Sequence, residues 1–127
     1  MREKQLFEQM KLWRNWTVEF LRTIPEDIVD QIPDGHTNNI RWNAGHLLVG
    51  WDHSMFPAVH QERQLSLSYH LMFPSGSKPD NWTELPPTME QIIMLLEKQP
   101  LLIEQACSGH LNEPLTEPFL GMKTIGD

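Results

Sequence analysis

The sequence predicts an all-α protein whose core is built by three long helices. Three segments repeat apolar residues at three- and four-residue spacing, which is typical of helices with one face in a core. Turn residues and prolines separate these segments, and no pair of segments shows the spacing of a β-hairpin. At 127 residues the chain is long enough for one core and not for two, so we expect a single domain over residues 1–127.

The first helix is predicted over residues 2–21. Its apolar residues alternate in steps of four and three, which predicts the core-facing stripe: Leu6, Met10, Trp13, Thr17, Phe20 and Ile24, widened by Phe7, Trp16 and Leu21. Pro25 disfavours helical geometry at the residue before it and should end this helix. A short helical turn over 25–32 is expected next, before the turn at residues 33–35.

The second helix is predicted within residues 38–56, with Asn38 or Asn39 as its cap and Pro57 marking its end. One stripe of this helix is predicted to face the core: Ile40, Ala44, Leu47, Leu48, Trp51 and Met55. A polar and aromatic stripe lies beside it: Asn39, Trp42, His46, Gly50 and His53.

A long connection over residues 57–87 holds a possible short helix at 62–73 and leaves open whether the next helix runs parallel or antiparallel to the second. The third helix is predicted to start at Thr88, which forms a capping box with Gln91. Its expected buried face consists of Met89, Ile92, Ile93, Leu96, Ile103 and Ala106. Pro100 predicts a kink and Gly109 a stop. Residues 110–127 are rich in turn residues and end in TIGD, which looks like the start of a further helix, so we expect the bundle to be incomplete at this end.

The composition argues against binding to nucleic acid and against a membrane-spanning segment, and it favours a reducing compartment. Ten basic against seventeen acidic residues give a net charge of -7, which opposes binding to a nucleic-acid backbone. No apolar run approaches the roughly 20 residues that span a bilayer, and the N-terminus lacks the apolar segment of a signal peptide. The lone Cys107 excludes an internal disulfide and fits a reducing compartment, so we expect a cytoplasmic protein.

His46 is the main chemical clue, because it lies between apolar residues on a core helix. Taken alone, such a histidine is most often a hydrogen-bonded core residue. The chain carries six histidines, at positions 36, 46, 53, 60, 70 and 110. A single helix presents two ligands to one metal at a spacing of three or four residues, whereas His46 and His53 are two turns apart, about 10.5 Å along the axis. The residues alone therefore indicate one ligand at most.

Two stretches resemble a known family. The segment NNIRWNAGHLLVGWDHSMF resembles the "IRW..GH(I/L)L" motif of the DinB-like (YfiT-type) four-helix-bundle proteins. The segment SLSYHLMFPSGSKPDNWTELPPTMEQIIMLLEKQP is similar to the F-x-x-G-(S/T)-x-P…W…PP(S/T)-x-E-(Q/E) stretch of the same family, and TIGD resembles the lead-in to its last helix. The resemblance runs from about Ile24 onward.

This resemblance implies an up-down four-helix bundle of which the chain holds three long helices and the lead-in to the fourth. It also implies a homodimer that binds a divalent metal, nickel or zinc, through three histidines. His46 matches the first of these, while the H-x-x-x-H pair of the last helix has no counterpart in the 127 residues. Members of the family are described as metal-dependent hydrolases or thiol transferases, related to the bacillithiol and mycothiol enzymes.

Two functions remain open. The first is a metal-dependent hydrolase or thiol transferase acting on a small-molecule or thiol substrate, in which the metal lowers the pKa of a water or thiol. The alternative is a non-catalytic bundle that acts through dimerisation or a protein partner, with a lost or structural metal site. The remaining candidates have simpler interpretations. We interpret Asp52 as a solvated charge and His53 as a surface residue or a support for His46. Cys107 is expected to be a small buried residue, and the tryptophans at 42, 51 and 82 to fill the core or anchor loops, with a groove role for Trp82 as a lesser alternative.

Overall fold

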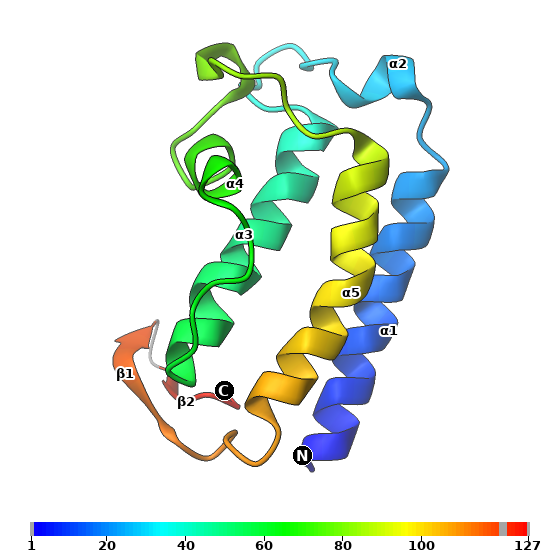
Figure 1. Cartoon of the computed structure of the whole chain (residues 1–127). Coiled ribbons are helices and arrows are strands. Elements are labelled where there is room, and N and C mark those ends of the chain that lie inside the picture. The colour runs from blue at the N-terminus through cyan, green and yellow to red at the C-terminus, as the bar shows by residue number, and fades with distance from the viewer. Residues whose placement is uncertain (1, 120–121, 127) are drawn as a thin grey trace.

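Three long helices form the body of the protein in a computed structural model that describes residues 2–119 and 122–126, and the side chains of 2–115 and 122–126 (Figure 1). They are α1 (Glu3–Arg22), α3 (Ile40–Ala58) and α5 (Met89–Cys107). The shorter elements are α2 (Glu26–Val29), α4 (Leu67–Met72), the 3-10 turn η1 (Pro79–Asn81), β1 (Pro114–Phe119) and β2 (Met122–Thr124). α5 packs against both α1 and α3. The described chain is mainly helical, so the all-α prediction is confirmed.

The connection between α3 and α5 is a crossover. α3 and α5 run in the same direction and α1 runs opposite to both (Figure 1). Residues 59–88 therefore return along the length of α3, placing α4 against it on the way. The sequence left open whether the second and third long helices are parallel or antiparallel, and the structure shows that they are parallel.

Both predicted helix caps are present. The Asn39 side chain accepts a hydrogen bond from the Trp42 N–H, and Thr88 and Gln91 form a reciprocal capping box at the start of α5. The end of α3 differs from the prediction, since Pro57 lies inside the last turn and the helix ends at Ala58. Proline removes the hydrogen bond to the carbonyl of residue 53 and its ring crowds that carbonyl, and the helix ends one residue later.

The core-facing stripe of α1 was predicted correctly only in part: Phe7 and Leu21 are buried as expected, and Met10 and Ile24 pack against the core. The buried residues are Phe7, Arg14, Val18 and Leu21. Trp13 and Phe20, from the predicted stripe, are 64% and 63% exposed. Apolar residues lie nearly all around this helix, so their spacing fits two orientations. In the orientation that α1 adopts, two ion pairs join it to α5: Lys11 pairs with Glu104, and Arg22 pairs with Glu97.

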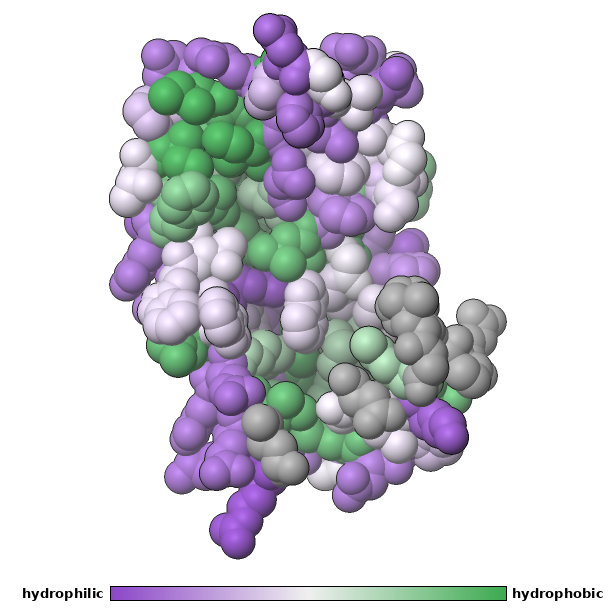
Figure 2. All heavy atoms as spheres, turned by 180° about the vertical axis from the view of Figure 1, so that it is seen from behind, coloured by the Kyte–Doolittle hydropathy of each residue, from purple (hydrophilic) through white to green (hydrophobic). Residues whose placement is uncertain are grey.

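The orientation of α1 about its own axis leaves four large apolar side chains exposed. We call this surface the α1 patch: Leu12, Trp13, Trp16 and Phe20. Trp13 and Trp16 contact each other edge to face, with ring centroids 5.0 Å apart. Apolar side chains gather over α1 and along a hollow between α1 and α3 when the molecule is viewed from behind (Figure 2). Among the described helices, none has the length and apolar character required to cross a lipid bilayer.

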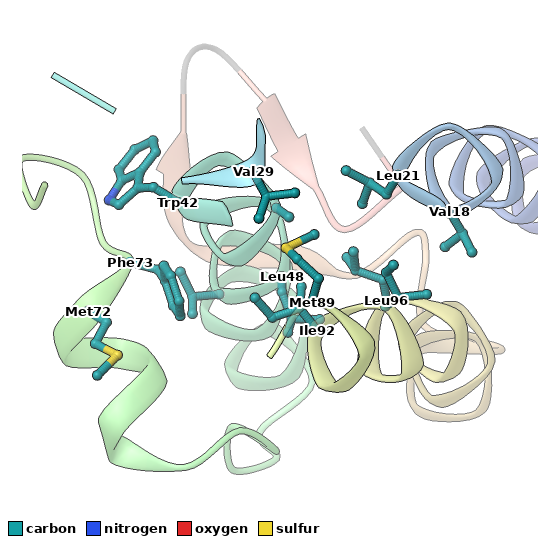
Figure 3. Close-up of a cluster of buried hydrophobic side chains, with 13 residues drawn as sticks. Val18, Leu21, Val29, Trp42, Leu48, Met72, Phe73, Met89, Ile92 and Leu96 are labelled. Carbon is teal, nitrogen blue, oxygen red and sulfur yellow. The ribbon is translucent and has the colours of Figure 1, made fainter. Parts of the chain in front are cut away.

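Two apolar clusters make up the core. The upper cluster joins the ends of α1 and α2 to α3, α4 and α5, and includes Leu48, Phe73, Ile92 and Leu96 (Figure 3). The lower cluster gathers Phe7, Phe56, Ile103, Ala106, Cys107 and Ile125. All six residues predicted for the buried face of α5 are buried, and Cys107 is fully enclosed as expected, with the pKa of its thiol raised by desolvation.

A small hairpin corrects the expectation of an irregular tail. β1 and β2 pair antiparallel, with Pro114 opposite Thr124 and Phe119 opposite Met122. Pro114 and Pro118 concealed β1, but a two-stranded sheet consists only of edge strands, where proline is tolerated. Thr124 ends β2, and Ile125 and Gly126 form a turn rather than the first residues of a helix. Asp127 lies outside the described residues.

Arg41, from the IRW motif, joins three segments at the upper end of the molecule. Its guanidinium donates two hydrogen bonds to the Asp30 carboxylate, at 2.7 and 3.0 Å, and a third to the Pro87 carbonyl at 2.7 Å. The hydrogen bonds between the two side chains lower the pKa of Asp30 and raise the pKa of Arg41. The arginine of the motif thus has a structural function, because it ties the residue after α2 and the approach to α5 onto the first turn of α3.

Candidate functional site

The two stretches that carry the family resemblance contact each other. Gly45 on α3 faces the ring of Phe73, the residue that follows α4, and a Cβ at position 45 would lie 2.4–2.5 Å from ring carbons. A contact that short is impossible, so only glycine lets Phe73 pack directly on the α3 backbone. Phe73 is fully buried there, beside Met72 and close to Leu48 and Ile92 (Figure 3).

His46 is held by Phe73, the residue whose ring packs against Gly45. Its Nδ1 lies 2.8 Å from the Phe73 carbonyl oxygen. A carbonyl can only accept, so this bond requires the proton on Nδ1 and leaves the lone pair on Nε2. The ring also stacks on Trp42, with centroids 4.5 Å apart and planes 12° from parallel. These two contacts fix both the tautomer and the direction of the imidazole.

The Nε2 atom of His46 remains available. Among the described residues it has no hydrogen-bond partner. Nε2 is also not fully enclosed. In the described part of the chain, Asn38 Oδ1 alone is a fully enclosed side-chain polar atom without a partner, so Nε2, which has no partner either, must be in part accessible. A histidine that donates one ring N–H to a backbone carbonyl and presents the other nitrogen has the usual arrangement of a metal ligand.

A second layer of contacts holds the Phe73 carbonyl in place. Trp42 Nε1 donates to Ser77 Oγ at 2.9 Å, and Ser77 Oγ donates onward to carbonyls of the same turn. Trp82 Nε1 donates to the Met72 carbonyl at 2.9 Å, and the Trp82 ring meets Phe73 edge to face. Trp82 therefore anchors a loop, as the simpler of its two interpretations predicted.

Asp52 has a function that the sequence analysis missed. We predicted a solvated charge, but Asp52 is 0% exposed. Its carboxylate accepts hydrogen bonds from the backbone N–H groups of Gln64 and Leu65, at 2.7 and 3.1 Å, and contacts His70 Nε2 at 2.7 Å. Asp52 thus attaches α4 and the loop before it to α3. Its spacing of seven residues from Gly45 places it on the same helix face, which is the signal that was available.

The other histidines do not join His46 in a ligand set. His53 is exposed beside a shallow hollow bordered by Glu62, Arg63 and Leu67. His110 lies 2.5 Å from Glu113 at the far end of α5. Among the side chains that the structure describes, those of residues 2–115 and 122–126, no three from His, Cys, Asp or Glu are close enough together to hold one metal ion. His46 is therefore a single ligand-like residue in this part of the chain.

Fold and site together define a helical-bundle protein in which one histidine, oriented by a backbone carbonyl, is presented from the second long helix. The family model described as the DinB superfamily matches residues 9–127. The chain therefore belongs to the DinB superfamily. The match begins earlier than the resemblance that we stated from Ile24 and takes in most of α1. No curated protein matches the sequence.

Proposed function

We propose that this protein is a divalent-metal protein of the DinB superfamily, a hydrolase or thiol transferase that acts on a small-molecule or thiol substrate in the cytoplasm. His46 Nε2 is one of its metal ligands, and nickel or zinc is the ion. The observation that carries this proposal is the hydrogen bond from His46 Nδ1 to the Phe73 carbonyl. That bond supports the tautomer that a metal requires, with the lone pair on Nε2, and fixes the direction of the ring.

The described residues fit one metal ligand and do not supply a full set. A divalent ion would lower the pKa of a bound water or thiol and so provide a nucleophile at neutral pH. The chain itself contributes the oriented imidazole, the Trp42 ring that covers one of its faces, and the turn at residues 73–77 that holds its partner carbonyl. Water and the substrate would fill the other coordination positions of an ion that the described residues hold through His46 alone.

Removing His46 tests the metal assignment. We expect weak binding of nickel or zinc by the 127-residue chain, since one protein ligand leaves an ion coordinated mainly by water, and we expect His46→Ala to abolish it. His53→Ala is the matched control, because His53 is exposed on the same helix and should leave binding unchanged. The measurement is a calorimetric titration of each variant with both ions. Tight, stoichiometric binding that survives His46→Ala would overturn the assignment.

A specific observation favours the non-catalytic alternative, an interaction domain that acts through dimerisation. The α1 patch exposes two tryptophans, a phenylalanine and a leucine on one helix. Clusters of exposed aromatic residues are typical of protein interfaces. We propose a homodimer under either function. The metal titration separates the two functions, because a wild-type chain that takes up neither nickel nor zinc would leave the interaction domain as the better account.

A further inference from the structure

Asp52 is a buried charged group that the proposed metal site does not itself use. It is 0% exposed, and its carboxylate accepts hydrogen bonds from the Gln64 and Leu65 N–H groups and from His70 Nε2. A buried carboxylate costs stability unless it is hydrogen-bonded, and these three donors meet that requirement. Because a carboxylate can only accept, His70 carries a proton on Nε2. Asp52 therefore holds the loop before α4 and a side chain of α4 itself.

Two side chains of α3 hold the segment over residues 62–73. In the described part of the chain, Asp52 and His46 are the two α3 side chains that hydrogen-bond to this segment. Asp52 binds the loop before α4 and His70, and His46 binds the carbonyl of Phe73, which follows α4. The two attachment points are six residues apart on α3, which is about 9 Å along the helix axis. α4 thus lies against α3 with an attachment toward each of its ends.

The backbone of α4 connects the two attachments. The Phe73 N–H donates to the Tyr69 carbonyl at 3.1 Å, which ties the peptide of Phe73 to the helical turn that carries His70. Such a turn is closed by its backbone hydrogen bond and moves as a unit. A shift of His70 away from Asp52 would therefore displace the Phe73 carbonyl as well.

The other contacts of this turn do not reach the Phe73 carbonyl. Ser77 Oγ donates to the carbonyls of Met72 and Pro74, and Trp82 Nε1 donates to that of Met72. These bonds hold the chain on either side of Phe73. Among the described residues, His46 is the group that meets the Phe73 carbonyl, so the position of α4 decides whether this bond forms.

We propose that Asp52 is a positioning residue for His46 and that it acts through His70 and α4. With α4 held, the Phe73 carbonyl stays where it accepts from His46 Nδ1, and the lone pair stays on Nε2. Without that acceptor the imidazole is no longer held to one tautomer, because the hydrogen bond of one ring nitrogen sets the state of the other. The inference rests on the proposed function, since a fixed lone pair on Nε2 serves a metal-binding histidine.

The tautomer of His46 in Asp52→Asn tests this inference. An amide has one accepting oxygen, and its NH₂ group would oppose the Leu65 N–H and His70 Nε2–H, so it cannot replace the carboxylate. Long-range ¹⁵N–¹H correlation spectra of the metal-free protein should show Nδ1–H alone in the wild type and a mixture with Nε2–H in the variant. The affinity for nickel should fall roughly 10-fold or more, as when a metal-binding histidine loses its outer partner. An unchanged tautomer in a folded Asp52→Asn variant would overturn the proposal.

Two substitutions of His70 test the route through α4. His70→Gln keeps a side-chain N–H that can donate to Asp52, so this variant should keep the wild-type tautomer of His46. His70→Leu removes the donor and should give the mixture. If Asp52→Asn does not fold, as judged by circular dichroism, this pair decides. The same His46 tautomer in both His70 variants would contradict the route.

Ile103→Val is the control for a loss of stability alone. Ile103 is 0% exposed on α5 in the lower cluster, so the shorter side chain should lower the unfolding midpoint and leave the tautomer of His46 unchanged. A mixture of tautomers in this variant would contradict a specific role of Asp52. The metal titration reports separately on the proposed function. A wild-type chain that takes up neither nickel nor zinc would remove that function, whereas the tautomers of the metal-free variants still test the positioning of His46.

Discussion

Leu48→Asp is expected to unfold the protein. Leu48 is 0% exposed on α3, and its neighbours in the upper cluster are apolar side chains of α3 and α5 (Figure 3). A carboxylate at this position would be buried among them, at a cost of several kcal/mol, which is comparable to the whole stability of a small domain. Urea unfolding followed by circular dichroism measures the effect.

Leu85→Asp provides the matched control, because Leu85 is 93% exposed and the same substitution there should leave the unfolding midpoint almost unchanged. A Leu48→Asp variant with a midpoint near that of the wild type would contradict the position of Leu48 in the core.

Gly45→Ala and Gly50→Ala are expected to act in opposite directions although both lie on α3. The added methyl at position 45 meets the Phe73 ring at 2.4–2.5 Å, so the ring and the turn that carries it have to move. Overpacking of this kind costs about 1–3 kcal/mol. At position 50 nothing lies within 4 Å of the added Cβ, and replacing glycine by alanine inside a helix should stabilise by about 1 kcal/mol. Equal effects of the two substitutions on the free energy of unfolding would contradict the contact between α3 and Phe73.

The local features of the fold could be predicted from the sequence because they depend on neighbours along the chain. The capping box at Thr88 and Gln91 and the buried stripe of α5 need only residues within one or two turns of each other. The rotation of α1 could not be predicted in this way. The residue at the centre of its buried face is Arg14, and its partner Gln99 is 85 residues away. From the sequence alone a charged residue is expected at the surface. Its burial becomes clear only when the carbonyl to which it donates a hydrogen bond is known.

The same distinction applies to the site. His46 could be singled out from its motif, but its orientation depends on a carbonyl 27 residues further along the chain. Asp52 was assigned to the surface for the corresponding reason, since the groups that it binds lie on the loop before α4 and on α4 itself. The two motifs could be identified as separate stretches of sequence. The structure shows that they contact each other, and that the contact requires glycine at position 45.

The tautomer of His46 is the most direct test of this account, because the presentation of Nε2 depends on the bond from Nδ1 to the Phe73 carbonyl. Long-range ¹⁵N–¹H correlation spectra of the metal-free protein at pH 8 distinguish a protonated from an unprotonated ring nitrogen, and His46→Gln identifies the signals. We predict that Nδ1 carries the proton and that Nε2 is the unprotonated nitrogen. A proton on Nε2 would show that the Phe73 carbonyl does not orient the ring, and it would contradict the assignment of His46 as a ready metal ligand.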